Sequence, residues 1–208
     1  MKLLIASQNP KKLKELHEIF AQVLPQKNLK KITLVSLSEF PNIQDVEEDG
    51  KTFEENAIKK ALGYAKQTGF LTLADDSGLC VDALDGGPGI FSARYAGAGK
   101  NDLDNCHKLI KEISSVPENK RSAHFECAVA IALPNRLIGT AHGTVSGVIL
   151  TAMRGSHGFG YDPLFYYPPF IKTLAEVPTS KKHQISHRFK ALKQAAVVLS
   201  KFLSDNNL

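Results

Sequence analysis

The sequence predicts an α/β fold built on one mixed sheet. Strand-like apolar runs alternate with helical patterns through the first half of the chain, two long β-rich runs adjoin between residues 123 and 150, and helical patterns stand near both chain ends. Such alternation is typical of a sheet covered by helices, and adjoining strand runs add an antiparallel part. With 208 residues, 43% of them hydrophobic, the chain can bury one sizeable core or two lobes on one sheet.

The chain opens with a short apolar strand at residues 2–6 (KLLIA), which is followed by a helix. Asn9 and Pro10 mark the helix start, because asparagine caps helices well and proline suits the first helical position. One face of this helix is apolar and is expected to turn inward. Its members are Leu13, Leu16, Ile19 or Phe20, and Val23.

A second strand is predicted at residues 31–37 (KITLVSL), before the acidic loop DVEEDG at 45–50. Thr52 and Glu55 then form a capping box, which opens a helix through about Gln67. The residues expected on the buried face of this helix are Phe53, Ala57, Ala61 and Ala65.

Residues 71–76 (LTLADD) predict a strand that runs into a Ser-Gly turn, followed by the short apolar run LCV at 79–81. A glycine-rich stretch at 86–97 leads to a helix from about Asn101 to Ile113. This middle part of the chain therefore carries the adjacent carboxylates Asp75 and Asp76 at the end of a predicted strand.

The runs AHFECAVAIAL at 123–133 and RLIGTAHGTVSGVIL at 136–150 meet at Pro134-Asn135, which predicts an antiparallel hairpin. The glycine loop RGSHGFGYDP follows at 154–163. An amphipathic helix from about Ser186 to Leu203 closes the chain. Repeats and linkers are lacking, so residues 1–208 are expected to form a single domain.

The formal charge of +5 comes from 26 basic residues that are dispersed along the sequence. Because no nucleic-acid-binding signature accompanies them, we do not expect a nucleic-acid partner. The basic residues form either a solvated basic face or a site for a small anionic ligand. The amino terminus lacks a signal-peptide core and no run could span a bilayer, which predicts a cytoplasmic protein without a membrane partner. The three cysteines, Cys80, Cys106 and Cys127, lack the spacing of a disulfide framework or structural zinc site and are expected to be buried.

Adjacent ionised carboxylates repel each other, so Asp75 and Asp76 need solvation, a proton or a cation. At a strand's carboxyl end, where ligands bind in open α/β sheets, they suit Mg²⁺, and the acidic loop offers Glu47, Glu48 and Asp49 as further oxygen ligands. Because a strand alternates its side chains, only one of the two aspartates should face the site. The competing interpretation is ordinary turn chemistry.

SQNPKK, at residues 7–12, brings free helix N–H groups, the Ser7 hydroxyl and two lysine ammoniums to one strand-to-helix turn, which predicts an anion site. An ordinary capped helix with solvated lysines is the alternative. Phe159 and Tyr161 offer a stacking surface for a base, or two core aromatics in a tight turn. His187 and Arg188 begin a helix and can donate to carbonyl or phosphate oxygens, or form a surface pair.

Taken together, five stretches in order from residue 7 to residue 192 resemble the inosine triphosphate pyrophosphatase family. They are SQNPKKLKEL, FEENAIKKA, LADDSGLCVDALDGGPGIFSARYAG, GFGYDPLF and ISHRFKAL. The resemblance implies hydrolysis of deaminated purine nucleoside triphosphates (ITP, dITP and XTP) to the monophosphate and pyrophosphate. It also implies an elongated two-lobed fold around a twisted mixed sheet, an active-site cleft between the lobes, and a homodimer.

The resemblance further implies roles for individual residues. Glu47 and Asp76 would hold Mg²⁺, and Asp76 would also accept the proton of the attacking water. The remaining positions would bind substrate: Ser7, Gln8, Asn9, Pro10, Lys11 and Lys12 along the triphosphate, together with Ser77, Phe159, Gly160, Tyr161, Asp162, Lys182, His187 and Arg188. Two rival functions are a pyrophosphatase for pyrimidine or modified nucleotides, and a nucleotide-sensing or RNA-binding protein without turnover.

Overall fold

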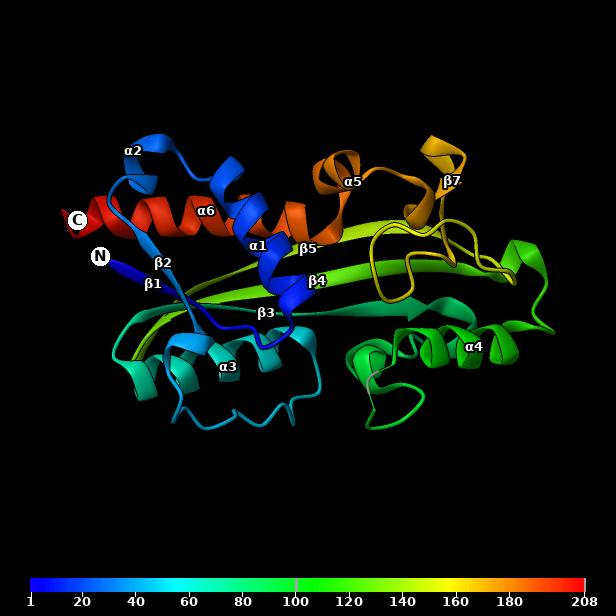
Figure 1. The fold of residues 1–208 in the computed structure, drawn as a ribbon, viewed down its shortest axis with the longest axis horizontal. Coiled ribbons are helices and arrows are strands. Elements are labelled where there is room, and N and C mark those ends of the chain that lie inside the picture. Colours follow the sequence, from blue (N-terminus) through cyan, green and yellow to red (C-terminus); the bar gives the residue numbers. More distant parts are fainter. Residues whose placement is uncertain (100, 208) are drawn as a thin grey trace. The chain divides into compact units, whose positions relative to one another are not determined.

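The computed structural model describes residues 1–99 and 101–207, in which seven strands form one mixed sheet (Figure 1). The strands are β1 (Lys2–Ile5), β2 (Thr33–Ser36), β3 (Leu71–Val81), β4 (Ser122–Leu133), β5 (Arg136–Ile149), β6 (Phe165–Tyr167) and β7 (Lys172–Thr173). Their order across the sheet is β2-β1-β3-β4-β5-β6-β7. β1 is parallel to β2 and β3, whereas β6 is antiparallel to β5 and β7. The predicted mixed α/β sheet is therefore confirmed.

The α-helices of the described residues are α1 (Pro10–Val23), α2 (Gln26–Leu29), α3 (Phe53–Thr68), α4 (Asp102–Ile113), α5 (Thr179–Ile185) and α6 (His187–Asp205). Three of them, α1, α3 and α4, begin at residues whose side chains cap them. The Asn9 side chain accepts the first N–H groups of α1, and Thr52 accepts the Glu55 N–H at 3.1 Å. The capping box of α3 is only half formed, because the Glu55 carboxylate accepts the backbone N–H of Lys51 instead.

The chain divides into two compact units, each with its own core. The first unit comprises Met1–Asp76, Cys127–Gly143 and the chain from Arg188 onward. Its largest core joins side chains of α1 and α6 to those of β1, β3 and β4. Helix α3 lies on the other side of these strands (Figure 1) and buries the alanine face that the sequence predicted.

The second unit comprises Ser77–Glu126 and Thr144–His187. Its core packs α4 against the strands through buried side chains that include Leu79, Leu109 and Phe125. The long strands β3, β4 and β5 each contribute residues to both units. The two-residue turn Pro134-Asn135 joins β4 to its neighbour β5, where the hairpin was expected.

The predicted turn at Ser77-Gly78 is wrong. Both residues lie inside the continuous eleven-residue strand β3, since the next three residues are buried and extend the strand. Asp75 and Asp76 are consequently in mid-strand and not at its end. The parallel pairing of β3 with β1 stops at Leu73, however, so the two aspartates do follow the carboxyl end of the parallel segment.

The short helices α2 and α5 and the short strands β6 and β7 were not predicted, because they are too short to show a periodic pattern. Cys80, Cys106 and Cys127 are buried free thiols, as expected. Among the helices of the described residues, none combines the length and the apolar composition that crossing a bilayer requires.

Candidate active site

Asp75 and Asp76 point to opposite faces of β3, as the alternation of strand side chains requires. Both are almost fully buried, with 2% and 6% of their surfaces exposed. Asp75 meets Arg188 of α6, whereas Asp76 meets Asn56 and Lys60 of α3. The two adjacent carboxylates therefore have different direct partners within the first unit.

Asp75 belongs to a buried ion-pair network. The Arg188 guanidinium is 1% exposed and lies between two carboxylates: its Nε is 3.4 Å from Asp75 and its Nη1 donates to Glu15 of α1. Burial alone would raise the pKa of Asp75, but the charges of Lys12, Arg188 and Lys60 outweigh it and lower this pKa to about 2. Asp75 is thus a permanently ionised, paired group.

The charges around Asp76 offset the effect of its burial less fully. The Asn56 amide donates to it at 3.1 Å, and the Lys60 ammonium lies 3.5 Å from its other oxygen. Burial raises the pKa of Asp76, and the negative charge of Glu48 raises it further. The charges of Lys60 and Lys12 lower this pKa, but it remains above its ordinary value. Asp76 is therefore the more basic carboxylate of the pair.

Lys60 connects Asp76 to the acidic loop, since its ammonium lies 3.0 Å from a Glu48 oxygen. Burial would lower the pKa of Lys60, but the three carboxylates Asp76, Asp75 and Glu48 outweigh burial and raise it. A stable cation thus sits between Glu48 and Asp76. Glu48 and Asp76 both present carboxylate oxygens to the Lys60 ammonium. Carboxylate oxygens are also the ligands that Mg²⁺ prefers.

The strand-to-helix turn at Ser7 to Lys12 differs from the expected free N–H site. The Asn9 side chain accepts the N–H groups of Lys11 and Lys12 at 2.9 and 3.2 Å, and Gln8 donates to Asp45. The side chains from Gln8 to Lys11 are exposed. What remains for an anion is the helix dipole and the lysine charges, of which Lys12 acts on both Asp75 and Asp76.

In the second unit, GFGYD folds into a tight turn closed by Asp162. Its carboxylate accepts the backbone N–H of Phe159 at 2.9 Å and pairs with the Lys182 ammonium at 2.6 Å. A Cβ at Gly158 would overlap this carboxylate, and the φ of +77° at this position also favours glycine. Asp162 and Lys182 are 2% and 5% exposed, so they form a buried pair.

The two aromatic residues of this turn have different roles. The Phe159 ring is partly exposed and lies 4.9 Å from the Lys182 ammonium, which leaves ring surface for a base. Tyr161 is buried, and its hydroxyl donates to the Ser92 carbonyl at 2.8 Å. The stacking interpretation therefore fits Phe159, and the core interpretation fits Tyr161.

His187 is buried beside the core of the second unit, where its ring stacks on Phe125 with centroids 4.9 Å apart. Ser77 is half-buried within β3. Arg188 is not the surface residue that one alternative suggested, since the first unit buries it in the network with Asp75. Each unit thus holds part of the expected substrate-binding set.

Among the three loop carboxylates that the sequence offered, the structure pairs Glu48 with Lys60, which Asp76 shares, while Glu47 and Glu48 are both exposed. The structure also adds two residues to which the sequence reasoning assigned no role. Asn56 and Lys60 are buried polar residues four positions apart on α3. That spacing, on the same face as the predicted alanine stripe, was the available signal.

Comparisons with known proteins agree on one family. The model of the Ham1 family matches residues 3–198 of this chain. A dITP/XTP pyrophosphatase from Desulforamulus reducens is 51% identical over 201 residues, which are 97% of this chain and 96% of the relative. The dITP/XTP pyrophosphatase of Geobacter sulfurreducens is 49% identical over 191 residues, 92% of each chain.

A solved structure supports the same relationship. The Staphylococcus aureus Ham1 protein matches with a TM-score of 0.84 and 40% identity, over 97% of this chain and 99% of that chain. The match to the family model over residues 3–198 spans all five stretches that carried the sequence resemblance.

Proposed function

Because this chain belongs to the Ham1 family, we propose that it hydrolyses deaminated purine nucleoside triphosphates (dITP, ITP and XTP) to the monophosphate and pyrophosphate. The observation that carries the proposal is the near full-length identity to proteins named dITP/XTP pyrophosphatase. The buried, basic carboxylate Asp76 beside Lys60 and Glu48 supplies the matching chemistry.

Asp76 is the proposed proton acceptor. Its raised pKa makes it a better base than an ordinary aspartate, and the Asn56 amide fixes one of its oxygens. Asp76 takes the proton of a water whose oxygen attacks the α-phosphorus. The bond between that phosphorus and the bridging oxygen to the β-phosphorus breaks, and pyrophosphate leaves with the electron pair.

Asp76 and a glutamate of the acidic loop are the proposed Mg²⁺ ligands. Glu47 is the position that the family resemblance implies, whereas Glu48 is the one that shares Lys60 with Asp76. Bound there, Mg²⁺ would neutralise phosphate charge and acidify the water. Carboxylate oxygens fit this hard cation, and the Lys60 ammonium already lies 3.0 Å from Glu48 and 3.5 Å from Asp76.

The substrate-binding roles are proposals of the same kind. Ser7 through Lys12 would line the triphosphate, since a triphosphate carries about four negative charges near neutral pH and needs cations around it. Phe159 would stack on the base beside Lys182, whose ammonium lies 4.9 Å from its ring, and His187 and Ser77 would contribute from the same unit. Gly160, Tyr161 and Asp162 would act by holding the shape of the turn that presents Phe159.

Four expectations about the whole protein stay predictions: a single domain with two lobes, an active-site cleft between the lobes, a homodimer and a cytoplasmic location. Size-exclusion chromatography with light scattering measures the oligomeric state directly.

The test of the proposed activity is a substrate panel of dITP, ITP, XTP, dATP, dGTP and dUTP with Mg²⁺, monitored by pyrophosphate release. We expect dITP and XTP to exceed dATP in kcat/KM by up to roughly 10⁴ to 10⁵, because a site that requires a hydrogen bond rejects mismatched groups. In heavy-oxygen water, the label should enter the monophosphate. A preference for dUTP would favour the pyrimidine-specific alternative, and binding without turnover would favour a nucleotide sensor.

A further inference from the structure

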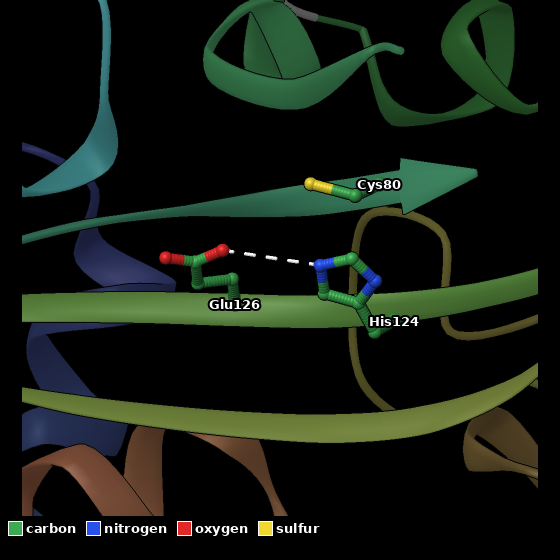
Figure 2. Close-up of side chains that lie close together, drawn as sticks. All are labelled: Cys80, His124 and Glu126. Carbon is green, nitrogen blue, oxygen red and sulfur yellow. Dashed lines mark ion pairs between the residues drawn. The ribbon is translucent and has the colours of Figure 1, made fainter. Parts of the chain in front are cut away.

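A second cluster of metal-binding side chains lies within the second unit. Figure 2 shows Cys80 on β3, with His124 and Glu126 on the neighbouring strand β4. One ligand atom from each residue lies within 4.8 Å of the others, and His124 Nε2 is 3.9 Å from a Glu126 oxygen. Within the described residues, this is the group of three such side chains that comes closest to a coordination sphere.

The backbone geometry explains why the three side chains converge. Leu79, Val81, Ala123 and Phe125 turn into the core of the second unit. Because strand side chains alternate, the intervening Cys80, His124 and Glu126 share the opposite face. His124 and Glu126 are two residues apart on one strand, and Cys80 comes from the adjacent strand. The cluster thus rests on two hydrogen-bonded strands, which are rigid supports for a metal site.

The surroundings of the cluster favour a cation. The Glu126 and Asp82 carboxylates act electrostatically on Cys80 and bring negative charge to the cluster. Asp82 is held in place as the acceptor of the Ser122 hydroxyl. His124 and Glu126 are about one third exposed at their side chains, so an ion can reach the cluster from solvent. A bound cation would offset the carboxylate charge and hold the thiol as thiolate.

We propose that Cys80, His124 and Glu126 bind one Zn²⁺, distinct from the carboxylate site at Asp76. One sulfur, one imidazole nitrogen and one carboxylate oxygen suit borderline-soft Zn²⁺, whereas Mg²⁺ requires oxygen ligands. With bond lengths of about 2.0 to 2.3 Å, ligand atoms in a tetrahedral zinc site lie about 3.3 to 3.6 Å apart. Side-chain rotation therefore brings the three atoms into range and leaves the fourth position open to water.

Cobalt(II) titration of the full chain tests the composition of the site, because Co²⁺ bound to a thiolate gives a near-ultraviolet charge-transfer band. We expect the band to saturate at one equivalent in the wild type, to disappear on adding Zn²⁺, and to be lost in Cys80→Ser. Cys106→Ser is the matched control, since Cys106 is a buried thiol of the same unit outside the cluster. This control should keep the band.

Competition with a chromophoric chelator measures the Zn²⁺ affinity of the same proteins. His124→Gln and Glu126→Gln should weaken Zn²⁺ binding at least about tenfold, and they keep the test decisive if Cys80→Ser folds poorly. Asp76→Asn should retain wild-type Zn²⁺ affinity, and Cys80→Ser should retain hydrolysis of dITP with Mg²⁺. The proposal is overturned if the wild type gives no thiolate band, if Cys80→Ser keeps it, or if Asp76→Asn abolishes Zn²⁺ binding.

Discussion

Asp75 and Asp76 are chemically identical neighbours, equally removed from water, yet their pKa values move in opposite directions. Asp75 faces the Arg188 guanidinium, and the surrounding cations overcome the effect of burial. Asp76 faces a lysine that is shared with Glu48, and burial prevails. The comparison teaches that the charges on each face of β3, rather than the depth of burial, decide which carboxylate is reactive.

Asp76→Asn should have the largest effect and tests whether Asp76 is the reactive carboxylate of the two. We expect kcat to fall by about 10² to 10⁴, because an amide is neither a base nor a good Mg²⁺ ligand. The amide oxygen can still accept from Asn56, so the fold should persist. Steady-state dITP hydrolysis and a thermal melt measure the two effects. Asp82→Asn, outside the first unit, is the control, and substantial activity in Asp76→Asn would remove Asp76 from the mechanism.

Arg188→Ala tests the other face of β3. Truncation leaves Asp75 and Glu15 buried without their guanidinium partner, so we expect a loss of about 3 to 5 kcal/mol in the free energy of unfolding. Arg154→Ala is the matched control, because Arg154 pairs with Glu176 at 3.3 Å on the surface and should contribute about 0 to 1 kcal/mol. Equal losses in urea melts of the two variants would contradict the structural role.

The same variant tests the substrate-binding role that the family resemblance implies for Arg188, specifically whether Arg188 reads the six-position of the purine together with His187. Arginine offers only donors, which match the six-position carbonyl of inosine and not the amino group of adenosine. If Arg188 reads the base, the ratio of ITP activity to ATP activity should be smaller in Arg188→Ala than in the wild type, with each activity normalised to the amount of folded protein. An equal decline of both activities per folded molecule would make Arg188 a general substrate anchor, and unchanged activities would assign it to stability alone.

The pH dependence of stability sharpens the role of Asp75. Its folded pKa of about 2 lies below its ordinary value near 3.8, so ionised Asp75 stabilises the folded state. That contribution is fully present above the ordinary pKa and is lost as the pH falls through about 2. It corresponds to about 2 kcal/mol. We expect the stability difference between wild type and Asp75→Asn in urea melts to shrink by this amount between pH 5 and pH 2, and a pH-independent difference would contradict it.

The sequence predicted the main helices because their caps are local signals. Asn9, Pro10 and Thr52 each act within a few residues of their own position. The family resemblance was also confirmed, since it rested on several stretches in register. The Ser77-Gly78 turn was wrong because a dipeptide preference cannot show that the following residues join a buried strand.

The candidate site was only partly predictable. Opposite orientation of Asp75 and Asp76 follows from strand geometry alone. The network joins Arg188 to Asp75, which is 113 positions away in the sequence, and to Glu15, which is 173 positions away. No local sequence pattern encodes such contacts. Lys60 looks like an ordinary helix lysine, and only packing of α3 against β3 brings it to Asp76. The proposed zinc site of Cys80, His124 and Glu126 likewise depends on the adjacency of β3 and β4 in the sheet.

Lys12→Ala should produce the smallest effect and probes a cation that, like Lys60, acts on both carboxylates. We expect kcat/KM for dITP to fall about tenfold, since negative charge on the leaving pyrophosphate grows in the transition state. Lys14→Ala is the matched control, because Lys14 lies on the same helix and its side chain is 80% exposed beside Glu18. An unchanged kcat/KM in Lys12→Ala would favour the alternative interpretation, in which SQNPKK is the start of an ordinary capped helix with solvated lysines.

The pH–rate profile of Lys12→Ala separates two ways in which this lysine can act. Its charge lowers the pKa of Asp76, so its removal should raise that pKa and shift the acid limb of the profile toward higher pH. If Lys12 also contacts the triphosphate, kcat/KM should remain depressed on the plateau, where Asp76 is ionised in both proteins. A shifted limb with a normal plateau would mean that Lys12 tunes the base without binding substrate. A depressed plateau with an unshifted limb would place its charge on the phosphates and away from Asp76.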